Sequence, residues 1–367
     1  MWGLGPHHER VTLEPPSRGG EPPGVRGLFQ QRVAGDDALL RLTSLRFAQA
    51  AMPAELYADT PGDAERLLDY LPDHATRPTV HLNRGTNLLD PDSRATILAF
   101  VDRLGDRVSG LIVHDKRDMI DRVPDLVEAL RVVGDRTQGP HVFMEYAAGA
   151  PLDWFADVAR RAGSFERAGV CVDTGHVGLA EVRRRLGTTL PPSARVTASD
   201  PGLQDVVAEV QAATREALPS VLSLIGELGR LGTTVHFHLH DGHPAIPGLS
   251  DHFSFLTRVP VPFEVDGARS LTQMFGPAGL AAILHEATSR ITPDRLSLTL
   301  EIHQAEGRLP LDPEAQKLFA RWRDRTNAER LNYWLSVVTS NHVLATSYLS
   351  KLAPRASGGV KQRDEGR

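Results

Sequence analysis

Cysteine is nearly absent from this sequence: Cys171 is the only one among 367 residues. An intrachain disulfide is therefore excluded, which is typical of a reducing compartment and predicts a cytoplasmic location. No apolar run reaches the roughly 20 residues that a membrane-spanning helix needs. The N-terminus also lacks the apolar segment of a secretory signal, so we expect no membrane association.

Positive charge is not in excess either. The chain has 41 Lys and Arg residues against 46 Asp and Glu residues, and its formal net charge is −5. Proteins that bind nucleic acids usually carry a basic surface, so a nucleic-acid partner is disfavoured and a small-molecule substrate is expected. The sequence also lacks a Gly-x-Gly-x-x-Gly turn after a strand and a Walker-type loop. Dinucleotide and P-loop nucleotide binding therefore have no support.

Short apolar runs alternate with segments of helical period along most of the chain. Eight candidate strands fall at 42–48, 54–58, 79–83, 110–114, 141–145, 169–173, 234–240 and 297–301. Helical segments between them include 62–71, 92–104, 119–133, 152–161, 177–186 and 279–289. This alternation predicts an α/β fold with a parallel sheet and right-handed crossovers. Eight strands favour a closed (β/α)8 TIM barrel over an open, doubly wound sheet.

The predicted organisation places the barrel between two tails. Residues 1–27 and 354–367 are rich in Pro, Gly and charge, and we expect both to be disordered. The catalytic barrel spans 28–312, with an insertion at 188–230 whose part 203–231 is helical and broken at Pro219. A helical extension follows at 313–353. Its apolar positions predict packing on the barrel or on a second copy of the chain: Phe319, Trp322, Leu331, Trp334, Leu335 and Val338.

One stretch, Thr234-Val-His-Phe-His-Leu-His-Asp241, reads as a buried strand with three histidines. Side chains alternate between the two faces of a strand, so His236, His238 and His240 share one face. Metal binding is the usual reason to gather neutral imidazoles, although histidines that are only hydrogen-bonded in a core would give the same pattern. We expect His236 to lie deeper in the barrel with a structural role.

Six candidate strands end in a side chain that can bind a metal, and in each strand this side chain opposes the apolar row. These strand-end residues are His81, His114, Glu145, Asp173, His238 and Glu301, with His240 after His238. Loops after two of the strands add His176, Asp251 and His252. The carboxyl ends of barrel strands converge at one mouth, where active sites of this fold lie.

This ligand set predicts a centre of more than one ion. Imidazoles and carboxylates together suit divalent Zn, Mn, Co or Fe. The nine candidates exceed what one ion can bind, so we expect two or three ions with bridging carboxylates. His303 lies two residues after Glu301, points to the same face and could reach the mouth. His240 and Asp241 could support the ligands or contact substrate.

At these residues the chain resembles the xylose-isomerase-like TIM-barrel superfamily, which includes endonuclease IV and many sugar-phosphate isomerases and epimerases. The resemblance covers roughly residues 40–305. It implies that Glu145, Asp173, His238 and Glu301 form the four-ligand core of the isomerase branch. It also implies that His81, His114, His176 and Asp251 correspond to the additional ligands of the trinuclear endonuclease IV branch. That branch has the pattern Asp-x-His, whereas in this chain His252 directly follows Asp251. The resemblance therefore does not fix the role of His252.

Three hypotheses follow from the resemblance. The first is a metal-dependent isomerase or epimerase of a small sugar-like hydroxy-carbonyl substrate, in which Glu145 or Glu301 moves the proton and His240 assists. The second is a multinuclear zinc phosphoesterase of the endonuclease IV kind. The third is an oxidative enzyme with two or three irons in the same set of ligands. A barrel that only binds a ligand is disfavoured, because nearly every strand end keeps a candidate ligand.

Overall fold

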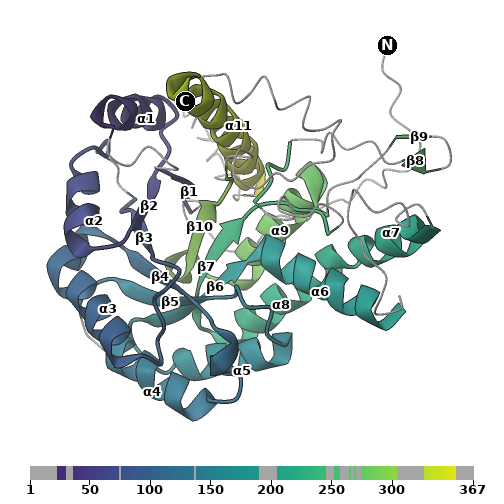
Figure 1. Cartoon of the computed structure of the whole chain (residues 1–367), viewed down its shortest axis with the longest axis horizontal. Coiled ribbons are helices and arrows are strands. Elements are labelled where there is room, and N and C mark those ends of the chain that lie inside the picture. The colour runs from purple at the N-terminus through teal and green to yellow at the C-terminus, as the bar shows by residue number, and fades with distance from the viewer. Residues whose placement is uncertain are drawn as a thin grey trace, which may run out of the picture.

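Eight parallel strands form a closed barrel in the computed structural model (Figure 1). The structure describes residues 23–29, 36–73, 76–135, 138–189, 205–244, 252–256, 264–265, 268–269, 274–303 and 326–352. The barrel strands are β1 (Val25–Leu28), β2 (Ala54–Ala58), β3 (Thr79–Leu82), β4 (Gly110–His114), β5 (His141–Glu145), β6 (Ala168–Asp173), β7 (Thr234–Leu239) and β10 (Leu296–Leu300). Strand β1 pairs with both β2 and β10 and closes the ring, which confirms the predicted (β/α)8 class.

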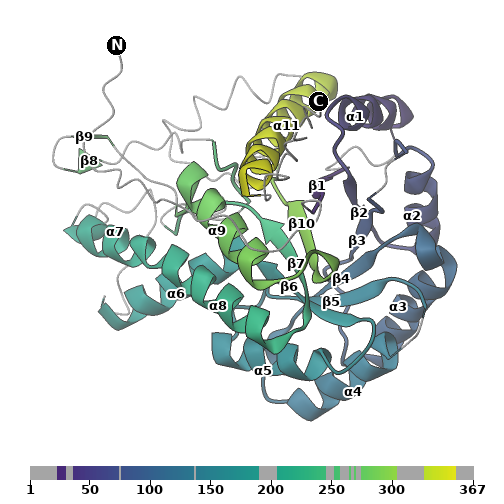
Figure 2. The same cartoon turned by 180° about the vertical axis from the view of Figure 1, so that it is seen from behind.

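Helices surround the barrel on its outside, as both views show (Figure 2). They are α1 (Asp37–Gln49), α2 (Pro61–Leu68), α3 (Pro91–Leu104), α4 (Val123–Gly134), α5 (Leu152–Ala162), α6 (Thr174–Thr189), α7 (Val207–Arg215), α8 (Ala217–Leu231), α9 (Gly276–Arg290) and α11 (Asn327–Leu352). A two-stranded antiparallel pair, β8 (Glu264–Val265) with β9 (Ala268–Arg269), lies outside the barrel. Among the helices described, none is both long and apolar enough to span a membrane.

The first strand of the barrel differs from the prediction. The candidate strand at 42–48 is wrong, because these residues lie in helix α1, which Asp36 caps by accepting from the backbone N–H of Leu39. The buried residues of α1 recur at helical spacing, whereas a half-buried strand would bury every second residue. The first strand is instead β1, most of which falls inside the tail predicted for 1–27.

The segment predicted as an insertion contains two helices. The break between α7 and α8 lies at Glu216 and not at Pro219, which is the third residue of α8. A proline is tolerated there because the first turn of a helix has no use for its N–H. Helix α8 packs against α5, α6 and α9 and leads into β7, so it belongs to the outer layer of the barrel. The stretch 190–204 lies outside the described residues.

Helix α11 provides the described part of the predicted C-terminal extension. It packs against α1, α9, β1 and β10 and thereby fills the outer layer where the first and last strands meet (Figure 1). Four of the apolar positions expected to pack are buried: Leu331, Trp334, Leu335 and Val338. Phe319 and Trp322 lie outside the described residues. The helix therefore covers β1 and β10 from the outside of the barrel.

Phe143 fills the interior of the barrel one layer below its mouth. It packs there with Ile112 and Cys171, and glycines on the two neighbouring strands leave room for its ring. A Cβ on Gly110 would lie 2.5 Å from a ring carbon of Phe143, and one on Gly169 would lie 2.5 Å from the carbonyl oxygen of Thr234. This layer separates the mouth from the amino-terminal end of the barrel.

We expect Gly169→Ala to lower the free energy of unfolding by about 1–3 kcal/mol, because the new methyl overpacks a closed interior. Urea unfolding followed by circular dichroism measures the change. Gly187→Ala is the matched control, since no atom lies within 4 Å of its added Cβ in helix α6. That substitution should leave stability unchanged or raise it by about 0.5–1 kcal/mol. Equal effects of the two substitutions would contradict the packing argument.

Candidate metal centre

The mouth of the barrel gathers a first group of candidate ligands: His81, Glu145, His238 and Glu301. Each comes from or directly follows a different strand, and each offers one ligand atom within 4.8 Å of the others. All four side chains are buried. The strand register explains why these side chains converge. Residues paired across neighbouring parallel strands point to the same side of the sheet, which here is the barrel interior. We refer to these four residues as the first group.

Glu145 lies at the centre of the first group and contacts three imidazoles. Its Oε2 atom is 3.0 Å from His81 Nε2 and 3.2 Å from His114 Nε2. Its Oε1 atom is 3.0 Å from His238 Nδ1. The same nitrogen of His238 is also 2.9 Å from Glu301 Oε2. Two carboxylates therefore meet at one imidazole nitrogen.

A second group of candidate ligands lies beside the first and consists of Asp173, His176, His240 and His252. Asp173 Oδ1 is 2.7 Å from His240 Nε2, and Asp173 Oδ2 is 3.2 Å from His176 Nδ1. The two groups meet where His252 Nε2 lies 3.5 Å from Glu301 Oε2. Glu301 is thus the carboxylate that could serve both groups.

The turn from β6 into α6 builds the second group directly from sequence. Helix α6 begins at the residue after Asp173, and the Asp173 carboxylate accepts from the backbone N–H of His176 at 2.7 Å. Asp173 therefore caps the helix and faces two imidazoles at once. Gly175 lies against the ring of His240, and a Cβ there would lie only 1.9 Å from His240 Cε1. Only glycine fits at this position of the turn.

His252 reaches the site from the loop after β7 with a backbone conformation that is uncommon for residues other than glycine. Its φ angle is +63°, in the left-handed region. Its backbone N–H donates to His240 Nδ1 at 2.8 Å, and its carbonyl accepts from the backbone N–H of His303 at 3.1 Å. Its ring stacks on those of His240 and His303, with centroids 4.2 and 3.9 Å apart. Strained backbone held by this many contacts is typical of functional sites.

Helix α11 supports the site from outside the barrel. Asn341 donates to Ser254 Oγ at 2.7 Å and accepts from the backbone N–H of Phe255 at 3.0 Å, which holds the loop that carries His252. Trp334 donates its indole N–H to the carbonyl of Ile302 at 2.8 Å, next to Glu301. An outer helix therefore fixes the segments that join the two groups.

Asp241 has a different role from the one considered in the sequence analysis. Its carboxylate accepts from the backbone N–H groups of Gly242, Phe275 and Gly276 at 2.6–3.2 Å. Burial raises its pKa to about 6, although these three hydrogen bonds act in the opposite direction. Asp241 therefore anchors the start of helix α9.

Charge in the two groups is strongly coupled. Burial alone would raise the pKa of Glu145 and of Glu301, but the nearby imidazoles outweigh it and hold both values well below the ordinary range. Burial also disfavours charge on His81, His238 and His240, yet the neighbouring acidic groups outweigh it and raise the pKa of each imidazole. The carboxylates of the site therefore stabilise positive charge that lies between them.

The donor set fits divalent metal ions. Three buried atoms at the mouth make no hydrogen bond in the described part of the chain, although each lies within 3.5 Å of a carboxylate oxygen or an imidazole nitrogen: His240 Nε2, Asp173 Oδ2 and Glu301 Oε2. Buried polar atoms are normally paired, and an unpaired cluster of nitrogens and carboxylate oxygens is what a cation satisfies. The buried His, Asp and Glu groups could therefore hold metal ions.

Eight of the nine predicted ligands come together at the mouth: His81, His114, Glu145, Asp173, His176, His238, His252 and Glu301. The ninth, Asp251, lies outside the described residues. Of the three residues predicted to be catalytic, Glu145 and Glu301 lie in the first group and His240 in the second. His303 also reaches the mouth, where its Nε2 is 3.3 Å from Glu301 Oε1.

Two residues of β2 were missed in the sequence analysis. Glu55 is fully buried with Oε1 3.0 Å from His238 Nε2, and Tyr57 donates its hydroxyl to Glu301 Oε1 at 2.6 Å. The signal was present, because Ala54, Leu56 and Ala58 form the apolar row and leave the other two residues on the opposite face. The same facing rule that selected the other strand ends would have selected them.

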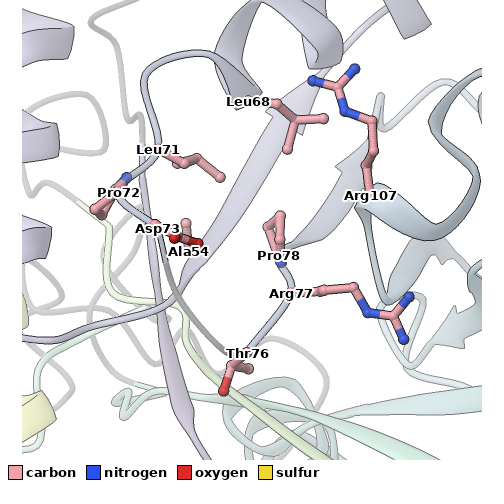
Figure 3. A pocket seen from close by; sticks show the side chains of 9 residues that line it. All are labelled: Ala54, Leu68, Leu71, Pro72, Asp73, Thr76, Arg77, Pro78 and Arg107. Atoms are coloured by element: carbon pink, nitrogen blue, oxygen red, sulfur yellow. The ribbon is translucent and has the colours of Figure 1, made fainter.

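A surface pocket of about 370 Å³ lies elsewhere on the barrel (Figure 3). Its lining includes Ala54, Arg77, Pro78 and Arg107, which lie at or just before the amino-terminal ends of β2, β3 and β4. The ligand groups lie at the opposite ends of these strands, so this pocket is not part of the candidate metal centre.

No family model and no curated protein matches this chain.

We expect metal binding to release protons and to strengthen with rising pH. The raised pKa of His81, His238 and His240 favours the protonated form of each ring, and an ion binds only the neutral form. Zinc titration calorimetry between pH 6 and 8, in two buffers of different ionisation enthalpy, measures the protons released. The His141→Gln control should release the same number, because burial lowers the pKa of His141 to about 4. An affinity that does not change with pH would contradict this account.

Proposed function

We propose that this protein is a divalent-metal-dependent isomerase or epimerase of a small, sugar-like hydroxy-carbonyl substrate. The observation that carries the proposal is the pair of buried carboxylates, Glu145 and Glu301, which meet at His238 Nδ1 at 3.0 and 2.9 Å. Moving a proton between adjacent carbons of such a substrate needs a base beside the carbonyl and an acid to return the proton. Glu145 or Glu301 could take the proton as a carboxylate and then return it as a carboxylic acid.

A divalent ion bound by the first group would polarise the substrate carbonyl and hold the neighbouring hydroxyl oxygen. Glu145 and Glu301 are ionised near neutral pH, since their pKa values lie well below the ordinary range. Each is therefore in the form that accepts a proton. The hydroxyl of Tyr57 donates to Glu301 Oε1 at 2.6 Å, which fixes the orientation of this carboxylate and leaves Oε2 facing His238.

The exposure of the site favours a small substrate. Glu145 and Glu301 are almost fully buried, while the side chains of His114, His176 and His303 are 10%, 15% and 16% exposed. A substrate would therefore approach past these three imidazoles and reach the carboxylates with its reacting carbons only. Buried carboxylates and few competing waters strengthen the electrostatic contribution to such a proton transfer.

A multinuclear zinc phosphoesterase is the second candidate, and the second group of ligands favours it. One ion in the first group is sufficient for an isomerase, yet Asp173, His176, His240 and His252 offer a further set of donors. The two groups meet at Glu301 and His252, 3.5 Å apart, which suits ions that share a ligand. Two or three adjacent ions are typical of enzymes that transfer phosphoryl groups.

Metal content separates these candidates. Elemental mass spectrometry of protein purified without added metal should find about one Mn, Co or Zn per chain if the isomerase proposal holds. Close to three zinc ions would favour the phosphoesterase, and two or three irons would favour oxidative chemistry. A chain that holds no metal, even after reconstitution, would overturn the proposed function altogether.

For the isomerase we expect incubation with sugars and sugar phosphates in deuterated water to place deuterium on the carbon next to the carbonyl. Glu145→Gln and Glu301→Gln should each lower this exchange by about 10²- to 10⁴-fold, because each removes a proton acceptor. Glu128→Gln, on the exposed face of α4, is the matched control and should exchange normally. Metal content is measured on every variant, since both carboxylates are also candidate ligands. Exchange at the control rate in both variants would contradict the assigned roles.

A further inference from the structure

Glu55 is a buried carboxylate one layer below the mouth, outside both ligand groups. It is fully buried on β2, and its Oε2 atom accepts three hydrogen bonds. The donors are Thr79 Oγ1 at 2.7 Å, Thr299 Oγ1 at 3.0 Å and His236 Nε2 at 3.1 Å. A carboxylate that is removed from water is costly unless its partners are fixed. Three donors from three other strands fix this one.

The chain of contacts continues to the amino-terminal end of the barrel. His236 Nδ1 lies 2.9 Å from Ser297 Oγ, and Arg26 donates to the same hydroxyl at 2.7 Å. Arg26 also donates to the carbonyl of Arg77 and to Ser109 Oγ. Glu55 is therefore held from below by a continuous polar network and cannot turn without breaking it.

The remaining oxygen of Glu55 faces a candidate metal ligand. Its Oε1 atom lies 3.0 Å from His238 Nε2, and neither atom has a hydrogen bond to any other group within the part of the chain that the structure describes. The other nitrogen of the ring, Nδ1, faces Glu145 and Glu301 at 3.0 and 2.9 Å. The His238 ring therefore lies between Glu55 below and the carboxylates of Glu145 and Glu301 above.

We propose that Glu55 is a positioning residue for the metal centre: it holds the proton of His238 on Nε2 and thereby presents the Nδ1 lone pair to an ion bound by the first group. The inference rests on the proposed metal-dependent function and deepens it. A histidine that binds a metal usually donates its other ring N–H to a carboxylate, which fixes both its tautomer and its orientation. Glu55 supplies such a carboxylate from the barrel interior.

A deeper ion site is the rival explanation, because Cys171, His236 and His238 also offer donor atoms within 4.8 Å of one another. The hydrogen bonds disfavour it. Both nitrogens of His236 are already engaged, one with Ser297 and one with Glu55. The Oε2 atom of Glu55 is likewise saturated by its three donors. An ion at this depth would have to displace several of these contacts.

The test measures zinc affinity and stoichiometry by competition with a chromophoric chelator, in the absence of substrate. Glu55→Gln removes the charge and keeps the shape, and it should weaken one zinc site per chain about 10- to 100-fold. Any zinc bound by the second group should keep its affinity and serves as an internal reference. Glu128→Gln makes the same change on the exposed face of α4, and Cys171→Ser removes the thiol of the deeper group. Both controls should bind zinc as the wild type does.

Three outcomes would overturn the inference. The first is wild-type zinc affinity in Glu55→Gln, and the second is an equal loss in Cys171→Ser, which would place an ion in the deeper group. The third is a proton on Nδ1 of His238 in the zinc-loaded wild type, read from long-range ¹H–¹⁵N spectra, which decides the matter if Glu55→Gln does not fold. If the wild type itself binds no zinc, Mn or Co, the proposed function fails with it. Normal binding by both wild type and Glu55→Gln removes only the role of Glu55.

Discussion

The two-residue repeat of a β-strand is the constraint on which the candidate centre depends. In a closed parallel barrel every second side chain points inward, and the carboxyl ends of all strands lie at one end. His81, Glu145, His238 and Glu301 meet because each occupies an inward position near the end of its strand. A shift of one residue in any of these strands would turn its ligand toward the helices and replace it with an apolar side chain.

This repeat also explains how much could be predicted from the sequence. Apolar rows opposite His, Asp or Glu identified the strand ends, and eight predicted ligands lie together at the mouth. Glu55 followed the same rule but was overlooked, because it is the second residue of its strand and lies away from the carboxyl end. Its importance arises from contacts with Thr79, His236 and Thr299, which are distant in sequence and become neighbours only when the barrel closes.

The errors in the fold have local causes. Residues 42–48 contain an apolar pattern short enough to suit either a strand or a helix, and the Asp36 cap with the packing of Leu40 and Phe47 decides for the helix. Strand β1 has only four residues and follows a segment rich in proline and glycine, so its sequence carries little signal. Its identity comes from pairing with β2 and β10, which is a property of the closed barrel and not of the four residues.

Helix α11 joins the last part of the chain to the centre that the rest of the chain builds. Trp334 holds the end of β10 beside Glu301, and Asn341 holds the loop that carries His252. During synthesis the ribosome therefore releases most of the ligands long before these two anchors exist. Strand β1 likewise cannot pair with β10, its neighbour in the ring, until β10 has been synthesised. The candidate centre is thus complete only after α11 has been synthesised, so any ions that it holds would bind to a chain that already includes this helix.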